Sequence, residues 1–159
     1  MSIRYEDATT DVMELAREII AEHFPELRNV KIKYLFDLKK RMSGGMNVLA
    51  RCQRSNDLLK FFTIDESGDE EGYAYIVYVD KLLWGNIERA DKTKLLRHEF
   101  RHIFIDDESA KNPYKLVDHD VSDFRDEIAL NTDDPRWDER LASLASDLYS
   151  QQEEMESEE

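Results

Sequence analysis

The segment 98–102, which reads H-E-F-R-H, constrains the fold of this chain more than any other feature. It lies in a run whose apolar residues keep helical spacing, and residues i and i+4 of an α-helix share one face. These apolar residues are Ile87, Ala90, Leu95, Leu96, Phe100, Ile103 and Phe104. The sequence therefore predicts a buried helix through Phe104, capped at its start by Asn86 or Asp91, that holds both imidazoles rigidly on one side.

Two imidazoles on one helical face favour a bound zinc ion. Neutral imidazole is a common zinc ligand, and catalytic zinc sites combine three protein ligands with a position for water. Glu99 lies next to His98, where it can take a proton from that water instead of completing the coordination shell. We therefore predict His98 and His102 as zinc ligands and Glu99 as a general base. The alternative is that the histidines are ordinary core or surface side chains.

The third metal ligand is expected downstream of the motif. His119 is the first choice, because three of the four histidines lie between positions 98 and 119. Carboxylates also bind zinc, so the rivals to His119 are Glu127, Asp120, Asp123 and Asp126. The extended metzincin motif is excluded, because it needs glycine at position 105 and histidine at position 108, where this chain has Ile105 and Glu108. The fourth histidine, His23, is assigned no role.

Composition indicates a single small globular domain. The chain has 159 residues, of which 41% are hydrophobic and 36% charged, and its net charge of −14 argues against non-specific binding of nucleic acid. No window approaches the roughly twenty apolar residues of a membrane span, and the N-terminus lacks a signal-peptide pattern. One cysteine, Cys52, fits a reducing compartment and reads as a structural thiol. We expect a cytoplasmic protein that binds a protein or peptide substrate, without nucleic-acid or membrane partners.

The order of the expected elements is helix, then strands, then helices, which predicts an α+β fold with an antiparallel or mixed sheet of three or four strands. One domain is expected over 1–150, and the acidic stretch 151–159 is expected to be a disordered tail. The expected elements are a helix over 10–24, a strand over 30–38, a turn at 43–45, an antiparallel partner strand over 46–53, a short apolar piece over 58–62, a strand over 73–79, the motif helix, a helix over 121–130, and a last helix opened by Asp134 and Pro135.

The sheet has a possible role in substrate binding. An extended peptide can pair with an exposed sheet edge through main-chain hydrogen bonds. The strand over 73–79, which precedes the motif helix, or its neighbour in the sheet, is the candidate for this edge. The alternative is an ordinary core strand with no exposed edge.

Several segments together suggest a family. They are Tyr34–Phe36, Val48–Arg51, Asp57–Phe62, Leu96–His102 and His119–Phe124. Over roughly 31 to 128 the chain resembles the phage metallopeptidase family, small zincins related to SprT-like and other minimal gluzincin-type domains. The resemblance implies a zincin-like fold and a zinc peptidase with His98, His102 and His119 as ligands and Glu99 as general base. SprT-like domains carry the third ligand in a His-Gly-x-x-Phe segment; here Asp120 replaces the glycine and Phe124 falls one position later.

Two other functions are compatible with the sequence. A zinc-stabilised binding module would hold the metal without turnover, although a purely structural site has no need of Glu99. An acidic DNA mimic would bind through charge, and its binding would survive mutation of His98. Chemistry at the motif favours metal-assisted hydrolysis of peptide bonds over both.

Overall fold

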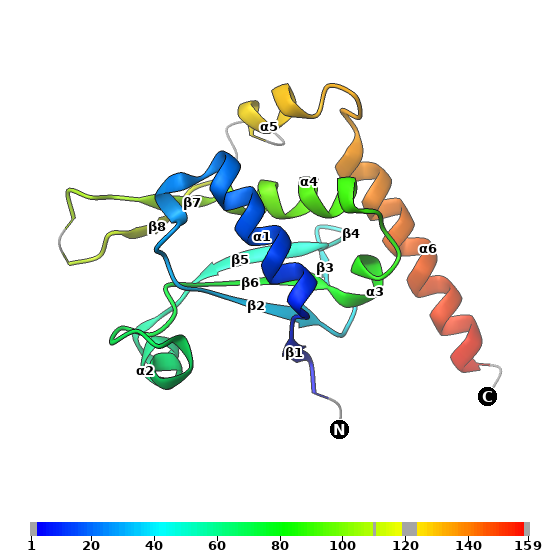
Figure 1. Cartoon of the computed structure of the whole chain (residues 1–159). Helices are drawn as coiled ribbons and strands as arrows, with labels where there is room; N and C mark the ends of the chain where they lie inside the picture. The colour runs from blue at the N-terminus through cyan, green and yellow to red at the C-terminus, as the bar shows by residue number, and fades with distance from the viewer. Residues whose placement is uncertain (1–2, 110, 119–123, 158–159) are drawn as a thin grey trace.

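The computed structural model describes residues 3–109, 111–118 and 124–157, and its architecture is a four-stranded sheet with helices packed around it (Figure 1). The strands are β1 (Tyr5–Asp7), β2 (Ile32–Asp37), β5 (Ala50–Arg54) and β6 (Tyr75–Asp80), in the spatial order β1-β2-β6-β5. The β2–β6 pair is parallel, and the β1–β2 and β5–β6 pairs are antiparallel. The predicted α+β class with a mixed sheet is confirmed.

The core lies between the sheet and two helices, α1 (Thr10–His23) and α4 (Arg89–Phe100). Strand β6 is buried along almost its whole length because it lies between two neighbours and under α4. A short 3-10 helix, Pro25–Leu27, follows α1 and buries Leu27 in the same core. This packing places the end of α4 beside β5, the last strand of the sheet.

The predicted pairing of the segment 46–53 with the strand over 30–38 is wrong. Strand β5 pairs with β6 instead, and β2 lies on the other side of β6. The most apolar strand takes the central position, where both of its edges and both of its faces are covered. The predicted turn is confirmed: Gly44 and Gly45 adopt positive φ angles between β3 (Met42–Ser43) and β4 (Met46–Asn47), which form a separate hairpin.

The motif helix is shorter than predicted. Helix α4 ends at Phe100, and the chain continues into β7 (Ile103–Ile105), which forms a hairpin with β8 (Tyr114–Leu116). The apolar residues of β7 continue the helical spacing of α4, which is why the sequence predicted a longer helix. Its β-branched isoleucines favour a strand, however, and pairing with β8 stabilises that strand. The predicted caps are also wrong, because the N-cap residue is Glu88 and it makes no side-chain capping bond.

The apolar piece over 58–62 belongs to helix α2 (Asp57–Ser67). Its N-cap is Asn56, whose side-chain oxygen accepts a hydrogen bond from the Leu59 N–H at 2.8 Å, and its C-cap is Gly68 in the left-handed region. Gly72 then turns the chain toward β6 with a φ of 76°, so close to α2 that a Cβ at this position would clash with the Lys60 carbonyl.

We predict that Gly72→Ala destabilises the protein by about 2–5 kcal/mol, because left-handed strain adds to the clash with the backbone of α2. Gly68→Ala is the matched control. Gly68 has a similar φ of 70° but nothing within 4 Å of the added Cβ, so the expected cost is only about 1–2 kcal/mol. Urea denaturation of both variants measures the difference, and equal losses would contradict the role of the close contact.

Three further helices complete the described residues: α3 (Lys81–Trp84), α5 (Arg125–Leu130) and α6 (Trp137–Ser157). Tyr149 of α6 donates a hydrogen bond to Asp80, whose other oxygen caps α3.

The acidic tail expected to be disordered instead continues α6 to Ser157. The start of the helix expected over 121–130 lies outside the described residues, and α5 forms its later part. Among the described helices, none combines the length and the apolar character needed to cross a membrane.

Candidate metal centre

The last turn of α4 brings His98, Glu99 and His102 together. His98 and Glu99 are in the helix, whereas His102 lies just beyond its C-cap. The His102 N–H donates to the Glu99 carbonyl at 3.1 Å, which continues the turn and preserves the spacing of the two imidazoles. One potential ligand atom from each of the three residues lies within 4.8 Å of the other two. The predicted ligand His119 and its rivals Asp120 and Asp123 lie outside the described residues.

A hydrogen bond fixes the orientation of the His102 imidazole. Its Nδ1 lies 2.7 Å from the Val117 carbonyl oxygen, which can only accept, so Nδ1 carries the proton. The other ring nitrogen, Nε2, is then unprotonated and can bind a metal. The Val117 N–H donates back to the His102 carbonyl at 2.7 Å. His102 is therefore held to the end of the β7–β8 hairpin on both its side chain and its backbone.

Buried aromatic rings pack against both imidazoles. The Phe124 ring centroid lies 5.5 Å from that of His98 and 5.0 Å from that of His102. Trp137, at the start of α6, lies 5.7 Å from His98 on ring centroids. Neither aromatic residue was predicted at the site, and only the occurrence of Phe124 close after the third histidine could have indicated one. These contacts restrict the rotamers of the imidazoles.

Glu99 is buried, in contrast to the partly exposed histidines on either side. Burial raises the pKa of its carboxyl to about 7, although nearby His98 and Arg51 and a hydrogen bond from the Cys52 backbone act in the opposite direction. A carboxyl with a pKa near neutrality can both accept and release a proton. Cys52 itself is buried, which raises the pKa of its thiol and agrees with the prediction that it is structural.

The cluster opens into a cleft of about 410 Å³. One wall is formed by Val48, Ala50 and Cys52, and the opposite wall by Leu116, Val117 and Asp118. The cleft therefore lies between the edge of the main sheet and the β7–β8 hairpin, with the three motif side chains at its base. A metal held there would be accessible to a bound molecule.

The comparison with protein families agrees with this geometry. Residues 3–149 match the family model described as "Putative phage metallopeptidase". The chain belongs to this family. The match extends over the sheet, α4 and most of α6, and it confirms the resemblance found in the sequence. Neither the curated proteins nor the solved structures contain a match to the chain. Membership of a metallopeptidase family implies a metal ion, and the His98–Glu99–His102 cluster is a group that can hold one.

In this family member, Glu127 occupies a different environment from that expected of a metal ligand. It is fully buried, and its two carboxylate oxygens accept hydrogen bonds from Arg97 at 2.7 Å and Arg101 at 2.9 Å. The side-chain oxygen of Asn131, the C-cap of α5, accepts from Arg97 at 2.6 Å. Arg97 directly precedes His98, and Arg101 lies within the motif itself. The carboxylate proposed as a rival ligand therefore links α5 to the end of α4 that carries the motif.

Among the described residues, no strand pairs with the edge of β5 that faces away from β6, although β8 lies near it and Arg54 donates to the Tyr114 carbonyl. The Leu49 carbonyl accepts from the Asp80 N–H, and the Ser55 N–H donates to the Ala74 carbonyl, so odd-numbered residues of this strand pair with β6. The backbone groups of Ala50, Cys52 and Arg54 therefore point to the opposite edge, where the Cys52 N–H bonds to Glu99. Strand β6 has no free edge, so the neighbour anticipated from the sequence, β5, is the strand available for pairing.

Proposed function

We propose that this protein is a zinc-dependent metallopeptidase. The proposal is carried by the convergence of His98, Glu99 and His102 in a cleft, with the His102 tautomer set so that Nε2 is the unprotonated nitrogen. Two imidazoles fit zinc better than magnesium or calcium, which prefer oxygen ligands. We propose His98 and His102 as two of the zinc ligands and His119 as the third.

Glu99 is the general base in this proposal. A bound zinc ion would supply a Lewis acid that makes water more acidic and polarises the scissile carbonyl. The Glu99 carboxylate takes the proton of the attacking water and then passes it to the leaving amine. Its burial and the hydrogen bond from the Cys52 backbone hold the carboxylate beside the imidazoles. The C–N bond of the substrate breaks as the amine departs with that proton.

The proposed substrate is a protein or peptide segment in an extended conformation. Such a segment can add to the edge of β5 that faces away from β6, using the backbone groups of Ala50 and the carbonyl of Cys52, whose N–H is already bonded to Glu99. This pairing would lay the segment along the cleft next to Glu99, because the same two residues form the cleft wall. Main-chain pairing supplies affinity with little dependence on sequence.

Metal content per chain tests the site. We predict about one zinc per chain in protein purified without an affinity tag, none in His102→Ala and a sharp loss in His119→Ala. His23→Ala is the matched control, because His23 is a histidine outside the His98–Glu99–His102 cluster whose ring packs against Phe24, and it should retain the metal. Elemental mass spectrometry measures the content, and a diverse peptide library measures cleavage.

The outcomes separate the alternatives. Zinc retained in His119→Ala would move the third ligand to a carboxylate. Stoichiometric zinc without cleavage of any library peptide would favour a binding module. Wild-type protein that takes up no metal even when zinc is supplied would overturn the proposal.

A further inference from the structure

Helix α2 turns its apolar residues toward solvent. Leu58, Phe61 and Phe62 have exposed fractions of 63%, 69% and 70%, and their i, i+3, i+4 spacing forms one continuous stripe, here called the α2 ridge. The opposite face of α2, which packs on the protein, carries the half-buried Leu59, Lys60, Thr63 and Ile64 and the buried Ser67. Helix α2 therefore has apolar side chains on both faces, and the exposed stripe is typical of a helix that docks into an apolar groove.

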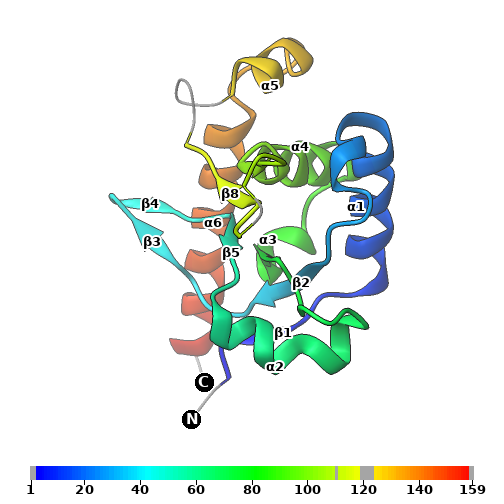
Figure 2. The ribbon, with the colours of Figure 1, turned by 90° about the vertical axis from the view of Figure 1, so that its left-hand side faces the viewer.

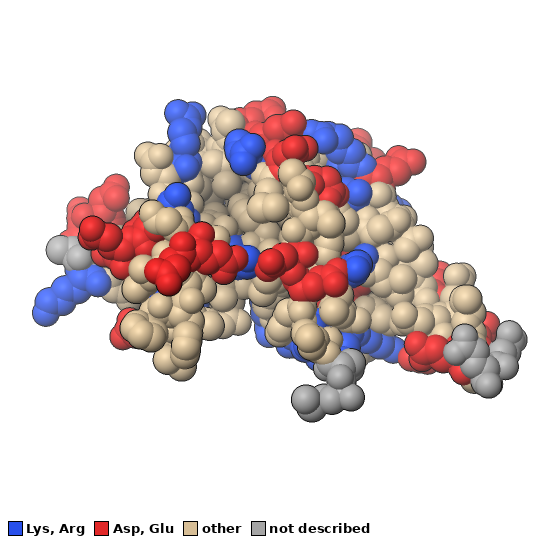
Figure 3. All heavy atoms as spheres, turned by 60° about the horizontal axis from the view of Figure 1, so that its bottom comes forward, with Lys and Arg blue, Asp and Glu red and all other residues tan. Residues whose placement is uncertain are grey.

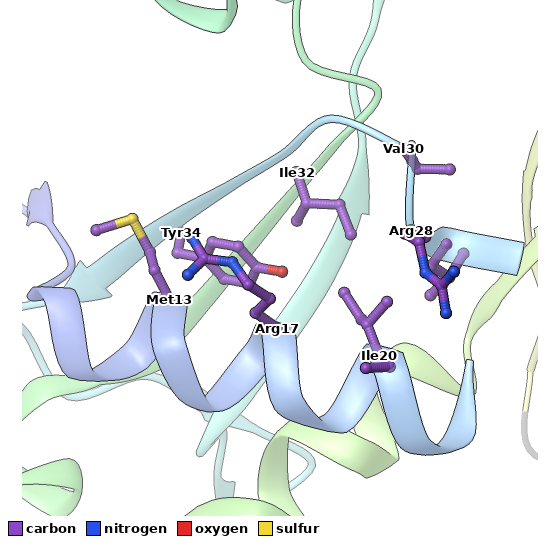
Figure 4. Close-up of a pocket in the computed structure, with 9 residues that line it drawn as sticks. Met13, Arg17, Ile20, Arg28, Val30, Ile32 and Tyr34 are labelled. Carbon is purple, nitrogen blue, oxygen red and sulfur yellow. The ribbon is translucent and has the colours of Figure 1, made fainter. Parts of the chain in front are cut away.

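An apolar groove of about 450 Å³ lies between α1 and β2, here called the α1–β2 groove. In Figure 4, Ile20 of α1 and Ile32 of β2 point into it, with the Tyr34 ring and Val30 alongside. Arg17 and Arg28 lie toward opposite ends of this row. A cavity of this size and lining is in the range that binds apolar ligands.

The ridge and the groove have complementary charges. Asp57 and Asp65 lie near the two ends of the ridge, and Arg17 and Arg28 border the groove. All four side chains are exposed, and none of them forms an ion pair with another described residue. Acidic side chains also form a band across the underside of the molecule, to which α2 belongs (Figure 3). The acidic side chains of the ridge are therefore complementary in charge to the arginines that border the groove.

The two surfaces lie on opposite faces of the sheet. Ile32 and Tyr34 line the groove with α1, whereas Lys33, between them on β2, pairs with Glu66 of α2. Neighbouring residues of a strand point to opposite faces. Figure 2 shows α1 and α2 separated by the strands. A chain therefore does not fill its own groove, and surfaces on opposite faces favour a head-to-tail contact over a reciprocal one.

We propose that the α2 ridge of one copy docks into the α1–β2 groove of a second copy, head to tail. Phe61 and Phe62 enter the groove between Ile20 and Ile32, and the two aspartates meet the two arginines at its ends. Because the contact is heterologous, each added copy leaves one ridge and one groove open for the next. The association is independent of the metal cluster, since neither surface includes a motif residue.

Sedimentation velocity of two complementary variants tests this contact. Phe61→Ser/Phe62→Ser removes the ridge and keeps the groove, whereas Arg17→Glu/Arg28→Glu reverses the groove charge and keeps the ridge. Wild type is expected to form species of two or more chains as its concentration rises to hundreds of micromolar at low salt. Each variant alone should raise the Kd for self-association by at least about tenfold. An equimolar mixture should form a species of two chains and no larger one, because only one ridge and one groove remain competent.

The control is Phe104→Ser, which removes an exposed aromatic residue of β7 outside both surfaces and should leave the association unchanged. Circular dichroism verifies that each variant is folded, which the exposure of all four substituted residues favours. A wild-type protein that stays monomeric at the highest concentration would overturn the proposal. So would association that persists in both variants, or a mixture that stays monomeric.

Discussion

Glu99→Ala is expected to keep its zinc and to lose about 10²–10⁴-fold in kcat/KM for peptide cleavage. The loss follows from removing the group that takes the proton of the attacking water. The metal should stay, because the imidazoles of His98 and His102 hold it and Phe124 packs against both rings. Steady-state kinetics on a cleaved peptide, together with elemental analysis of the same protein, measure the two effects.

Glu99→Gln separates proton transfer from packing. The amide keeps the volume of the buried side chain and can still accept the hydrogen bond from Cys52, but it cannot act as a base. Its activity should match that of Glu99→Ala, while its thermal stability should stay closer to wild type. His102→Ala, in contrast, should lose both metal and activity. Loss of zinc from the Gln variant would contradict this division of roles.

Glu127→Ala is expected to destabilise the protein by about 3–5 kcal/mol, because it leaves the buried guanidinium of Arg97 without its carboxylate. For a chain of this length, that loss corresponds to a fall in Tm of roughly 6–20 °C. Urea and thermal denaturation measure it. The same variant, assayed below its melting point, should retain about one zinc per chain, because arginines rather than a metal occupy its carboxylate.

Asp134→Ala is the control for this network. Asp134, between α5 and α6, also pairs with an arginine, Arg140, but both side chains of that pair are partly exposed, and Lys94, its other partner, keeps Asp133. Its removal should shift the unfolding midpoint far less than that of Glu127. A folded Glu127→Ala protein that has lost its zinc would return Glu127 to the set of ligands.

The metal cluster could be predicted from the sequence because it depends on local spacing. His98 and His102 stay on one side of the chain even though α4 ends between them, since the turn from Glu99 to His102 continues the helical path. The support around the cluster could not be predicted. The Val117 carbonyl that orients His102 lies just after β8, on the strand opposite His102, and a backbone carbonyl carries no signal in the sequence.

Long-range pairing accounts for most of the differences in the fold. The antiparallel partner of β5 is set by which strand occupies the centre of the sheet, and hydrophobic periodicity says little about that order. The sequence suggested Glu127 as a rival metal ligand and assigned no role to Arg97 or Arg101, whereas in the structure the buried Glu127 carboxylate accepts hydrogen bonds from both arginines. Helix α2 is the opposite case. Its apolar residues Leu58, Phe61 and Phe62 are of the kind that usually lies in a core, but here they are exposed to solvent.

The open edge of β5 has a consequence for which molecules can become substrates. A segment that adds to this edge must offer backbone N–H and C=O groups that are not already hydrogen-bonded, and a stably folded target has few of these. Loops, termini and chains that have not yet folded offer them freely. The conformational state of the target would then select it for cleavage more strongly than its amino-acid sequence, so that folding itself confers resistance.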